Sequence, residues 1–94
     1  MLGFGILIEV DGEQHFKYTP HFHKTKKDFT HAKQNDYYKN SYALSHGLKL
    51  YRIPYWELEN IQSYNDLFQQ KFLVRTKWHN DQVYRQHLTE ENQK

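Results

Sequence analysis

The sequence predicts a small α/β domain in which helices flank a mixed β-sheet. Two short apolar segments, residues 4–10 and 48–55, have the composition of buried strands. The segment between them is long enough to form a crossover helix, so the two strands can run parallel. A length of 94 residues allows a single domain. A chain this short buries only about 60–65% of its unfolded surface. We therefore expect a thin core, rich in the aromatic residues that make up 17% of the chain.

The first quarter of the chain has the pattern of a hairpin followed by a loop. Residues 4–10 are apolar and β-branched, and Asp11-Gly12 is a dipeptide typical of hairpin turns. Residues 14–18 alternate in polarity and are predicted to form a second, shorter strand. Residues 19–27 hold Pro20 and several lysines, which favours an exposed loop.

A helix is predicted over about residues 28–45, because Gly47 is a suitable residue to end it. One face of this helix is defined by helical spacing and is expected to lie against the core: Phe29, Ala32, Asp36, Asn40 and Ala43. Asp36 and Asn40 therefore place two polar groups where core-facing side chains are expected.

The second half of the chain is predicted to contain one strand and two helices. The strand at 48–55 would direct Leu48, Leu50 and Arg52 to one face and Tyr51, Ile53 and Tyr55 to the other. A helix is expected within 57–72, its buried face formed by Leu58, Ile61, Phe68 and Phe72. A short third helix is expected at 81–88, with the last six residues frayed. We divide the chain into a core, 1–73, and a basic and polar C-terminal extension, 74–94.

Composition excludes several classes of protein. With 13 Lys+Arg against 11 Asp+Glu, the net charge of +2 does not fit a histone-like binder or an acidic tail. The absence of cysteine excludes disulfides, thiolate catalysis and cysteine zinc sites, and fits a reducing compartment. No apolar run approaches the roughly 20 residues of a membrane helix, and no basic segment precedes the first apolar one. We expect an intracellular protein, cytoplasmic or nuclear, with no membrane partner.

Acidic and histidine residues gather after the first predicted strand. Glu9 and Asp11 are two residues apart and would share one face of that strand. A carboxylate at the end of a core strand is costly to bury unless a positive group compensates it, and Mg²⁺ prefers such ligands. His15, just past the turn, is a suitable general acid or base, and Asp36 from the helix can join it. Singly, each residue is more often a solvated turn, surface or helix residue; their joint occurrence favours a site.

Three segments of the chain resemble, in order, the motifs of one enzyme family. They are IEVDGEQHF at 8–16, QNDYYKN at 34–40 and LKLYRIPY at 48–55. They resemble small endonucleases related to very-short-patch-repair enzymes, including homing endonucleases with an EDxHD core, from phages and mobile elements. The resemblance covers residues 6–61 and implies a restriction-endonuclease-like fold that hydrolyses DNA phosphodiester bonds with Mg²⁺ or Mn²⁺.

The resemblance also implies roles for individual residues. His15 matches the general acid or base, and Asp36 matches the aspartate that orients it. Val10 matches a position whose backbone carbonyl contacts the metal, while Glu9 and Asp11 match acids at or near the metal. Lys39 and Arg52 match basic positions that contact phosphate. The family has an upstream strand with another metal-binding aspartate, and no acidic residue precedes Glu9 here.

The lysines of the predicted loop are the expected DNA contacts: Lys17, Lys24, Lys26 and Lys27. Contacts of this kind bind the phosphate backbone without reading its sequence. Three interpretations remain open for the whole chain. It is an active endonuclease, or a catalytically inactive remnant that binds DNA, or a fragment that completes its site in a homo-oligomer. A further interpretation is that the lysines form only a solvated surface.

Overall fold

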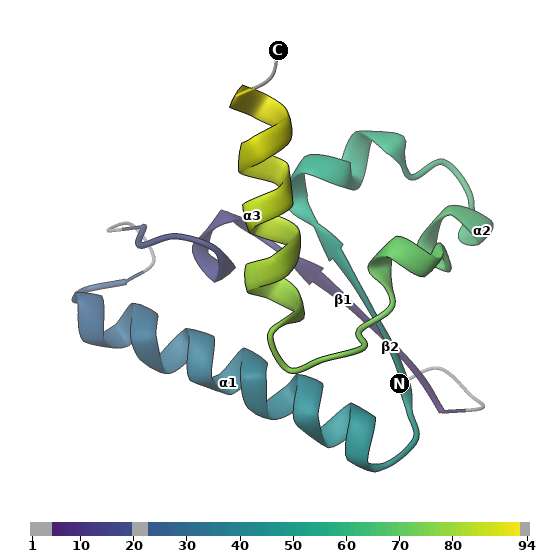
Figure 1. The fold of residues 1–94 in the computed structure, drawn as a ribbon, viewed down its shortest axis with the longest axis horizontal. Helices are drawn as coiled ribbons and strands as arrows, with labels where there is room; N and C mark the ends of the chain where they lie inside the picture. The colour runs from purple at the N-terminus through teal and green to yellow at the C-terminus, as the bar shows by residue number, and fades with distance from the viewer. Residues whose placement is uncertain (1–4, 20–22, 93–94) are drawn as a thin grey trace.

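Two parallel strands form the centre of the fold. The computed structural model describes residues 5–19 and 23–92. Strand β1 (Ile6–Asp11) pairs in parallel with β2 (Lys49–Pro54), in a register that runs from Ile6 opposite Lys49 to Asp11 opposite Pro54. Helix α1 (Lys26–Ser45) connects them, as Figure 1 shows. The predicted α/β class and the parallel crossover are therefore confirmed. The expected start of the first strand at residue 4 lies outside the described residues.

The predicted hairpin is wrong. Gly12 is extended, with φ −74° and ψ 176°, and the chain then forms the 3-10 helix η1 (Glu13–His15). His15 N–H donates to the carbonyl of Gly12, and Phe16 N–H donates to that of Glu13. The alternation at 14–18 therefore does not belong to a strand. The His15 side chain contacts Asp36, and the Phe16 ring packs against Trp56 and Tyr84. Among the described residues the sheet is parallel and not mixed.

Helix α1 starts two residues earlier than predicted and ends as predicted. Thr25 and Asp28 form a capping box, in which each side chain accepts the other residue's backbone N–H. Gly47 follows the helix with φ +66°, the left-handed conformation that favours glycine. The predicted inner face is confirmed at its centre, since Asp36, Asn40 and Ala43 are the buried residues of α1.

The two faces of β2 carry the predicted side chains. On the α1 side, Leu50 packs with Ala43 and Val74. On the other side, Tyr51 and Ile53 pack with Phe72. Arg52 shares the face of Leu50 but is surrounded by polar groups, as described below.

The region 57–72 does not form the single helix that the sequence predicts. It consists of η2 (Tyr55–Asn60), α2 (Tyr64–Leu67) and η3 (Gln70–Phe72). The carboxylate of Asp66 accepts the backbone N–H groups of Gln62 and Ser63, which ends the preceding turn and begins a new one. Ile61, Phe68 and Phe72 still pack on the sheet as expected, whereas Leu58 is exposed.

Helix α3 (His79–Asn92) is longer than the predicted 81–88 and extends through most of the segment expected to fray. It crosses in front of the sheet in Figure 1. Asp81 accepts hydrogen bonds from Lys33 and from the hydroxyl of Tyr37, which joins α3 to α1. None of the helices in the described parts of the chain is long and apolar enough to cross a membrane.

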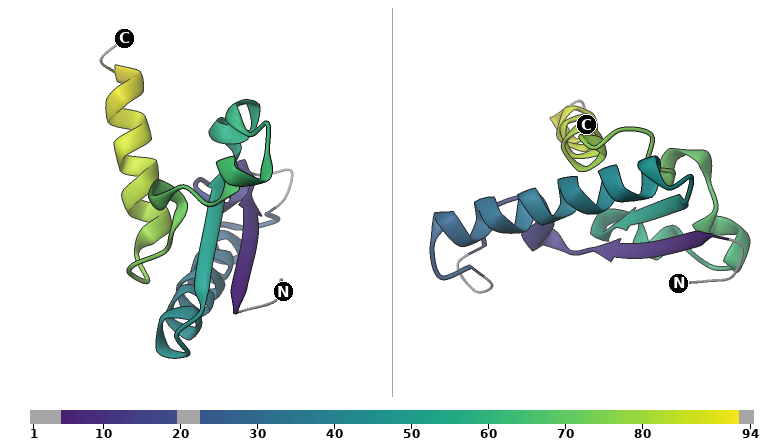
Figure 2. Two further views of the ribbon diagram at one scale, coloured as in Figure 1. Left: turned by 90° about the vertical axis from the view of Figure 1, so that its right-hand side faces the viewer. Right: turned by 90° about the horizontal axis from the view of Figure 1, so that it is seen from below.

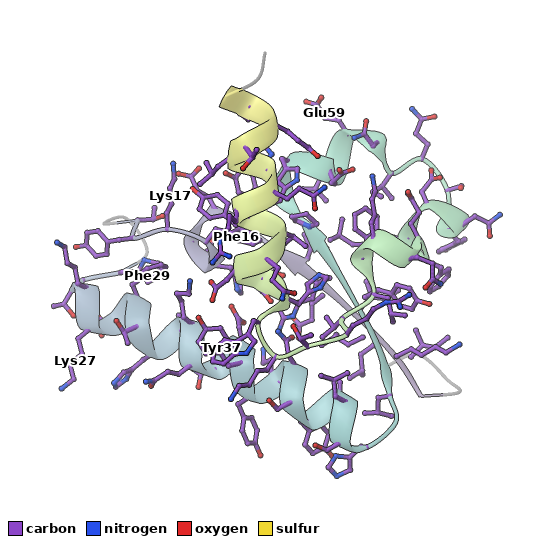
Figure 3. The ribbon with its side chains drawn as sticks, in the orientation of Figure 1. Phe16, Lys17, Lys27, Phe29, Tyr37 and Glu59 are labelled. Carbon is purple, nitrogen blue, oxygen red and sulfur yellow. The ribbon has the colours of Figure 1, made fainter. Side chains whose placement is uncertain are left out.

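An aromatic cluster holds the other side of α3. Phe16 lies 4.9 Å from Trp56 and 5.3 Å from Tyr84, measured between ring centroids, and points toward α3 in Figure 3. Val74 and Asn80 are also buried, at 5% and 2% exposed. The described part of the predicted C-terminal extension therefore contacts the core through buried residues, with α3 lying on the β2 side of the sheet in the left view of Figure 2.

Candidate functional site

Three elements bring Asp11, His15 and Asp36 together. Asp11 ends β1, His15 ends η1, and Asp36 lies near the middle of α1. One ligand atom from each of these residues lies within 4.8 Å of the others. Asp11 and Asp36 are buried, whereas the His15 side chain is 25% exposed. The histidine therefore forms the boundary between two enclosed carboxylates and solvent.

The His15 ring is oriented by Asp36. Its Nδ1 lies 2.9 Å from Asp36 Oδ2 and 3.6 Å from Asp11 Oδ1. No described residue hydrogen-bonds the other ring nitrogen, Nε2. A hydrogen bond at Nδ1 fixes the tautomer and direction of an imidazole, so Nε2 is the atom that can exchange a proton with a ligand.

A closed ring of hydrogen bonds surrounds Asp11. Arg52 Nη1 donates to Asp11 Oδ1 at 2.7 Å, and Arg52 Nε donates to Asn40 Oδ1 at 2.7 Å. Asn40 Nδ2 donates to Asn80 Oδ1 at 3.1 Å, and Asn80 Nδ2 donates to Asp11 Oδ2 at 3.0 Å. All four side chains are almost completely buried. Because each group satisfies the next, the ring fixes the position of the Asp11 carboxylate.

Arg52 is the permanent positive charge of this cluster. Its Nη2 is buried without a hydrogen bond and lies 3.5 Å from Asp36 Oδ1. Two ionised aspartates against one guanidinium leave one negative charge when His15 is neutral. A protonated His15 or a bound cation would compensate that charge, so the two compete for the site.

The pKa values reflect this environment. The hydrogen bond to Asp36 raises the pKa of His15 above its ordinary 6.5, against the opposing effect of burial. Burial raises the pKa of Asp11, although Arg52 and His15 act in the opposite direction. His79, at the start of α3, has its pKa lowered to about 4, chiefly by burial and further by Arg52.

The depressed pKa of His79 predicts acid destabilisation. A histidine with a pKa of about 4 in the folded state and 6.5 in the unfolded state stabilises the fold fully above pH 6.5. That contribution is lost as the pH falls toward 4 and amounts to about 3 kcal/mol. We expect urea denaturation between pH 7 and pH 4 to show this loss, and a His79→Gln variant to lack it.

The variant must be compared with wild type, because His15 and Asp11 change the stability of the fold with pH in the direction opposite to His79. The raised pKa of His15 gives stability that is present below pH 6.5 and lost as the pH rises, and protonation of Asp11 favours the folded state in acid. His31→Gln, at an exposed residue of α1, is the control and should keep the wild-type dependence. Equal pH dependence in His79→Gln and wild type would contradict the assignment.

The structure does not bring the carboxylate of Glu9 to this group. Glu9 shares the α1-facing side of β1 with Asp11, as predicted, but its carboxylate lies 3.5 Å from Lys39 Nζ in an exposed pair. It is not among the residues whose ligand atoms converge. Val10 is 54% exposed, and because side chains alternate along a strand it lies on the opposite face; the predicted metal contact of its backbone carbonyl stays a prediction.

Arg52 is not a surface contact for phosphate. It is 1% exposed and holds Asp11 and Asn40, so the prediction that it meets DNA is wrong. A guanidinium at a core-facing strand position is buried here because Asp11 of β1 and Asp36 and Asn40 of α1 supply acidic and amide partners. Lys39 is half-exposed at 53% and remains accessible beside Glu9.

The predicted loop lysines lie on the surface. Lys17 pairs with Glu13 at 2.9 Å on the exposed side of η1. Lys24, Lys26 and Lys27 are exposed at the start of α1, where Lys27 points away from the body of the molecule in Figure 3. The remaining part of the loop, residues 20–22, lies outside the described residues.

Asn80 is a member of the cluster that the sequence did not indicate. Its contact with Asp11 joins residues 69 positions apart, and no local pattern around 80 indicates it. Asn40 did carry a signal, because it occupies a core-facing position of the predicted helix. Its partners, Arg52 and Asn80, become evident only in the folded chain.

One relative of this chain is found among known proteins at the level of sequence. No family model matches the chain, and no solved structure matches it. A relative with the printed name "Uncharacterized protein 307L", from Invertebrate iridescent virus 6, is 35% identical over 48 residues. That match covers 51% of this chain and 24% of the relative. The chain thus spans about a quarter of the length of the curated relative it matches.

Proposed function

We propose that this chain forms a metal-dependent endonuclease that hydrolyses DNA phosphodiester bonds, on a core of the restriction-endonuclease type. The observation that supports this most is the position of His15, a partly exposed imidazole between two buried carboxylates from separate elements. The resemblance of residues 8–16, 34–40 and 48–55 to the motifs of repair and homing endonucleases supports the choice of DNA as the substrate.

The donor set fits a divalent cation. Asp36 Oδ1 makes no hydrogen bond with a described residue, its nearest cationic atom being Arg52 Nη2 at 3.5 Å. Carboxylate oxygens are the ligands that Mg²⁺ and Mn²⁺ prefer, and imidazole is a further acceptable ligand for Mn²⁺. Asp36 and Asp11 are therefore the residues that would hold the ion. A cation bound there would polarise the scissile phosphate and lower the pKa of water.

The residues of the chain have distinct tasks in this mechanism. His15 Nε2 moves a proton to or from the attacking water or the leaving oxygen, while Asp36 holds the ring at Nδ1. The closed ring of Arg52, Asn40 and Asn80 keeps Asp11 in place. The exposed lysines bind the phosphate backbone without reading bases: Lys17, Lys24, Lys26, Lys27 and Lys39.

Plasmid cleavage tests this proposal directly. Supercoiled DNA should be nicked or linearised by the purified chain in the presence of Mg²⁺ or Mn²⁺, and excess EDTA should stop the reaction. Because His15 protonation competes with cation binding, the apparent affinity for the metal should weaken as the pH falls. DNA that stays intact with both metals over a pH range would refute the enzyme.

A second function, non-catalytic DNA binding, is favoured by one observation. Both oxygens of Asp11 are already bonded, to Arg52 and Asn80, so Arg52 takes the place of a cation beside that carboxylate. Thermal unfolding distinguishes the two functions. A cation at 100 times its dissociation constant stabilises a protein by about 2.7 kcal/mol. A melt indifferent to Mg²⁺ and Mn²⁺, together with salt-sensitive DNA binding, would support the inert module.

A further inference from the structure

The outer edge of β1 has no partner among residues 5–19 and 23–92. The sheet has the order β1-β2, and the other bridge in the described chain joins Tyr51 to Leu73. In the left view of Figure 2, β2 lies between β1 and α3, so β1 is the outer strand. Edge strands of stable proteins are usually protected by lysine, proline or a bulge. Strand β1, with the sequence ILIEVD, has neither lysine nor proline.

The hydrogen-bonding groups of this edge can be identified. Lys49 N–H donates to the carbonyl of Gly5, and residues of a parallel strand alternate in the side to which they bond. Residues 7, 9 and 11 therefore bond toward β2. The N–H and carbonyl groups of Ile6, Ile8 and Val10 point toward the free edge. Val74 N–H, which bonds to Leu50 on the far side of β2, agrees with this alternation.

We propose that a second copy of this chain pairs with the edge, so that two β1 strands run antiparallel about a two-fold axis at Ile8. In that register Ile8 faces its own copy, and Ile6 faces Val10 of the partner subunit. Each of these residues would exchange both backbone hydrogen bonds with the residue opposite, as antiparallel pairing requires. The edge is self-complementary, which is the property a two-fold interface needs.

The side chains at this edge fit a copy of themselves. Val10 is a β-branched residue that is 54% exposed, and in the proposed register it packs against the partner's Ile6. On the opposite face, Leu7 and Glu9 border a groove of about 320 Å³, together with Tyr38, Lys39, Tyr42 and Leu50. The exposed rings of Tyr38 and Tyr42 would be covered as the two α1 helices approach each other.

The charges at the edge also permit the dimer. Glu9 is the charged side chain of β1 near the axis, and Lys39 already lies 3.5 Å from it. The pair enters the interface neutral, and a two-fold axis brings it toward an equally neutral pair. If the two β1 strands pair at the usual spacing of about 4.8 Å, the two sheets join into one four-stranded sheet. A four-stranded sheet is more stable than the two-stranded sheet of one chain.

Sedimentation equilibrium of the full chain tests the dimer, with Val10→Lys as the variant. Wild type should pass from one chain to two as its concentration rises, and Val10→Lys should weaken association at least about tenfold, or 1.4 kcal/mol. Leu88→Lys is the matched control, since Leu88 is similarly exposed, at 45%, but lies on α3. A wild-type chain that stays monomeric, or a dimer that Val10→Lys leaves unchanged, would overturn the proposal.

Hydrogen exchange locates the interface on the chain, which the molecular mass from sedimentation does not do. The amides of Ile8 and Val10 should exchange more slowly as the protein concentration rises, while circular dichroism confirms that Val10→Lys is folded. Protection of these amides that is independent of concentration would mean that the chain covers its own edge. A dimer in which they exchange freely would mean that the interface lies elsewhere. Either result would overturn the proposal.

Discussion

Replacing His15 with alanine is expected to reduce metal-dependent DNA cleavage by about 10²–10⁴-fold, the usual contribution of a general acid or base. The reason is that His15 is the proton-exchanging group at the boundary of the Asp11 and Asp36 cluster, with Nδ1 held and Nε2 unbonded by described residues. The rate of plasmid nicking under saturating metal gives the measurement, and circular dichroism checks the fold.

His31→Ala is the matched control, because His31 is an exposed histidine of α1 outside the cluster. It should cleave DNA at the wild-type rate. Cleavage by His15→Ala at a rate within a few-fold of wild type would remove His15 from the mechanism, whatever the activity of the parent chain.

A conservative change at Asp36 tests whether this residue acts by positioning and charging the His15 ring. Asp36→Asn keeps the size of the side chain but removes the carboxylate whose hydrogen bond, and then whose charge, raises the pKa of His15. The pH–rate profile of this variant should therefore shift toward lower pH if His15 acts as a base. A lower rate with no shift in the profile would show that Asp36 does not act through the pKa of His15.

Replacing Arg52 with methionine is expected to destabilise the fold by about 3–5 kcal/mol, the cost of leaving a buried charge without its partner. Arg52 and Asp11 are each 1% exposed and are joined by a 2.7 Å hydrogen bond. Without the guanidinium, Asp11 and Asp36 face each other with no positive charge except a protonated His15. Urea denaturation at pH 7 measures the loss.

Lys71→Met is the control for Arg52→Met. Lys71 pairs with Glu57 at 3.2 Å, but its side chain is 54% exposed, and surface pairs contribute about 0–1 kcal/mol. If the acids bind a cation, Mn²⁺ should restore more stability to Arg52→Met than it adds to wild type. A loss as small as that of Lys71→Met would show that the buried pair is not needed for folding.

Local sequence determined the elements whose causes lie within a few residues. Thr25 and Asp28 begin α1, and Gly47 follows its end in a left-handed conformation; each lies within one turn of the helix end that it sets. The alternation of Leu50 and Tyr51 correctly assigned the two faces of β2. The polar positions Asp36 and Asn40 on the apolar face of α1 correctly indicated an unusual buried group.

Only the tertiary structure decided what those polar groups do. Asp11-Gly12 forms no hairpin, because η1 turns His15 back to Asp36, a residue 21 positions away. The role of Arg52 changed from a surface contact to the buried partner of Asp11, 41 positions away, and Asn80 entered from α3. A buried charge is stable only where its partners converge, and that convergence depends on distant elements packing together, which no local pattern of residues records.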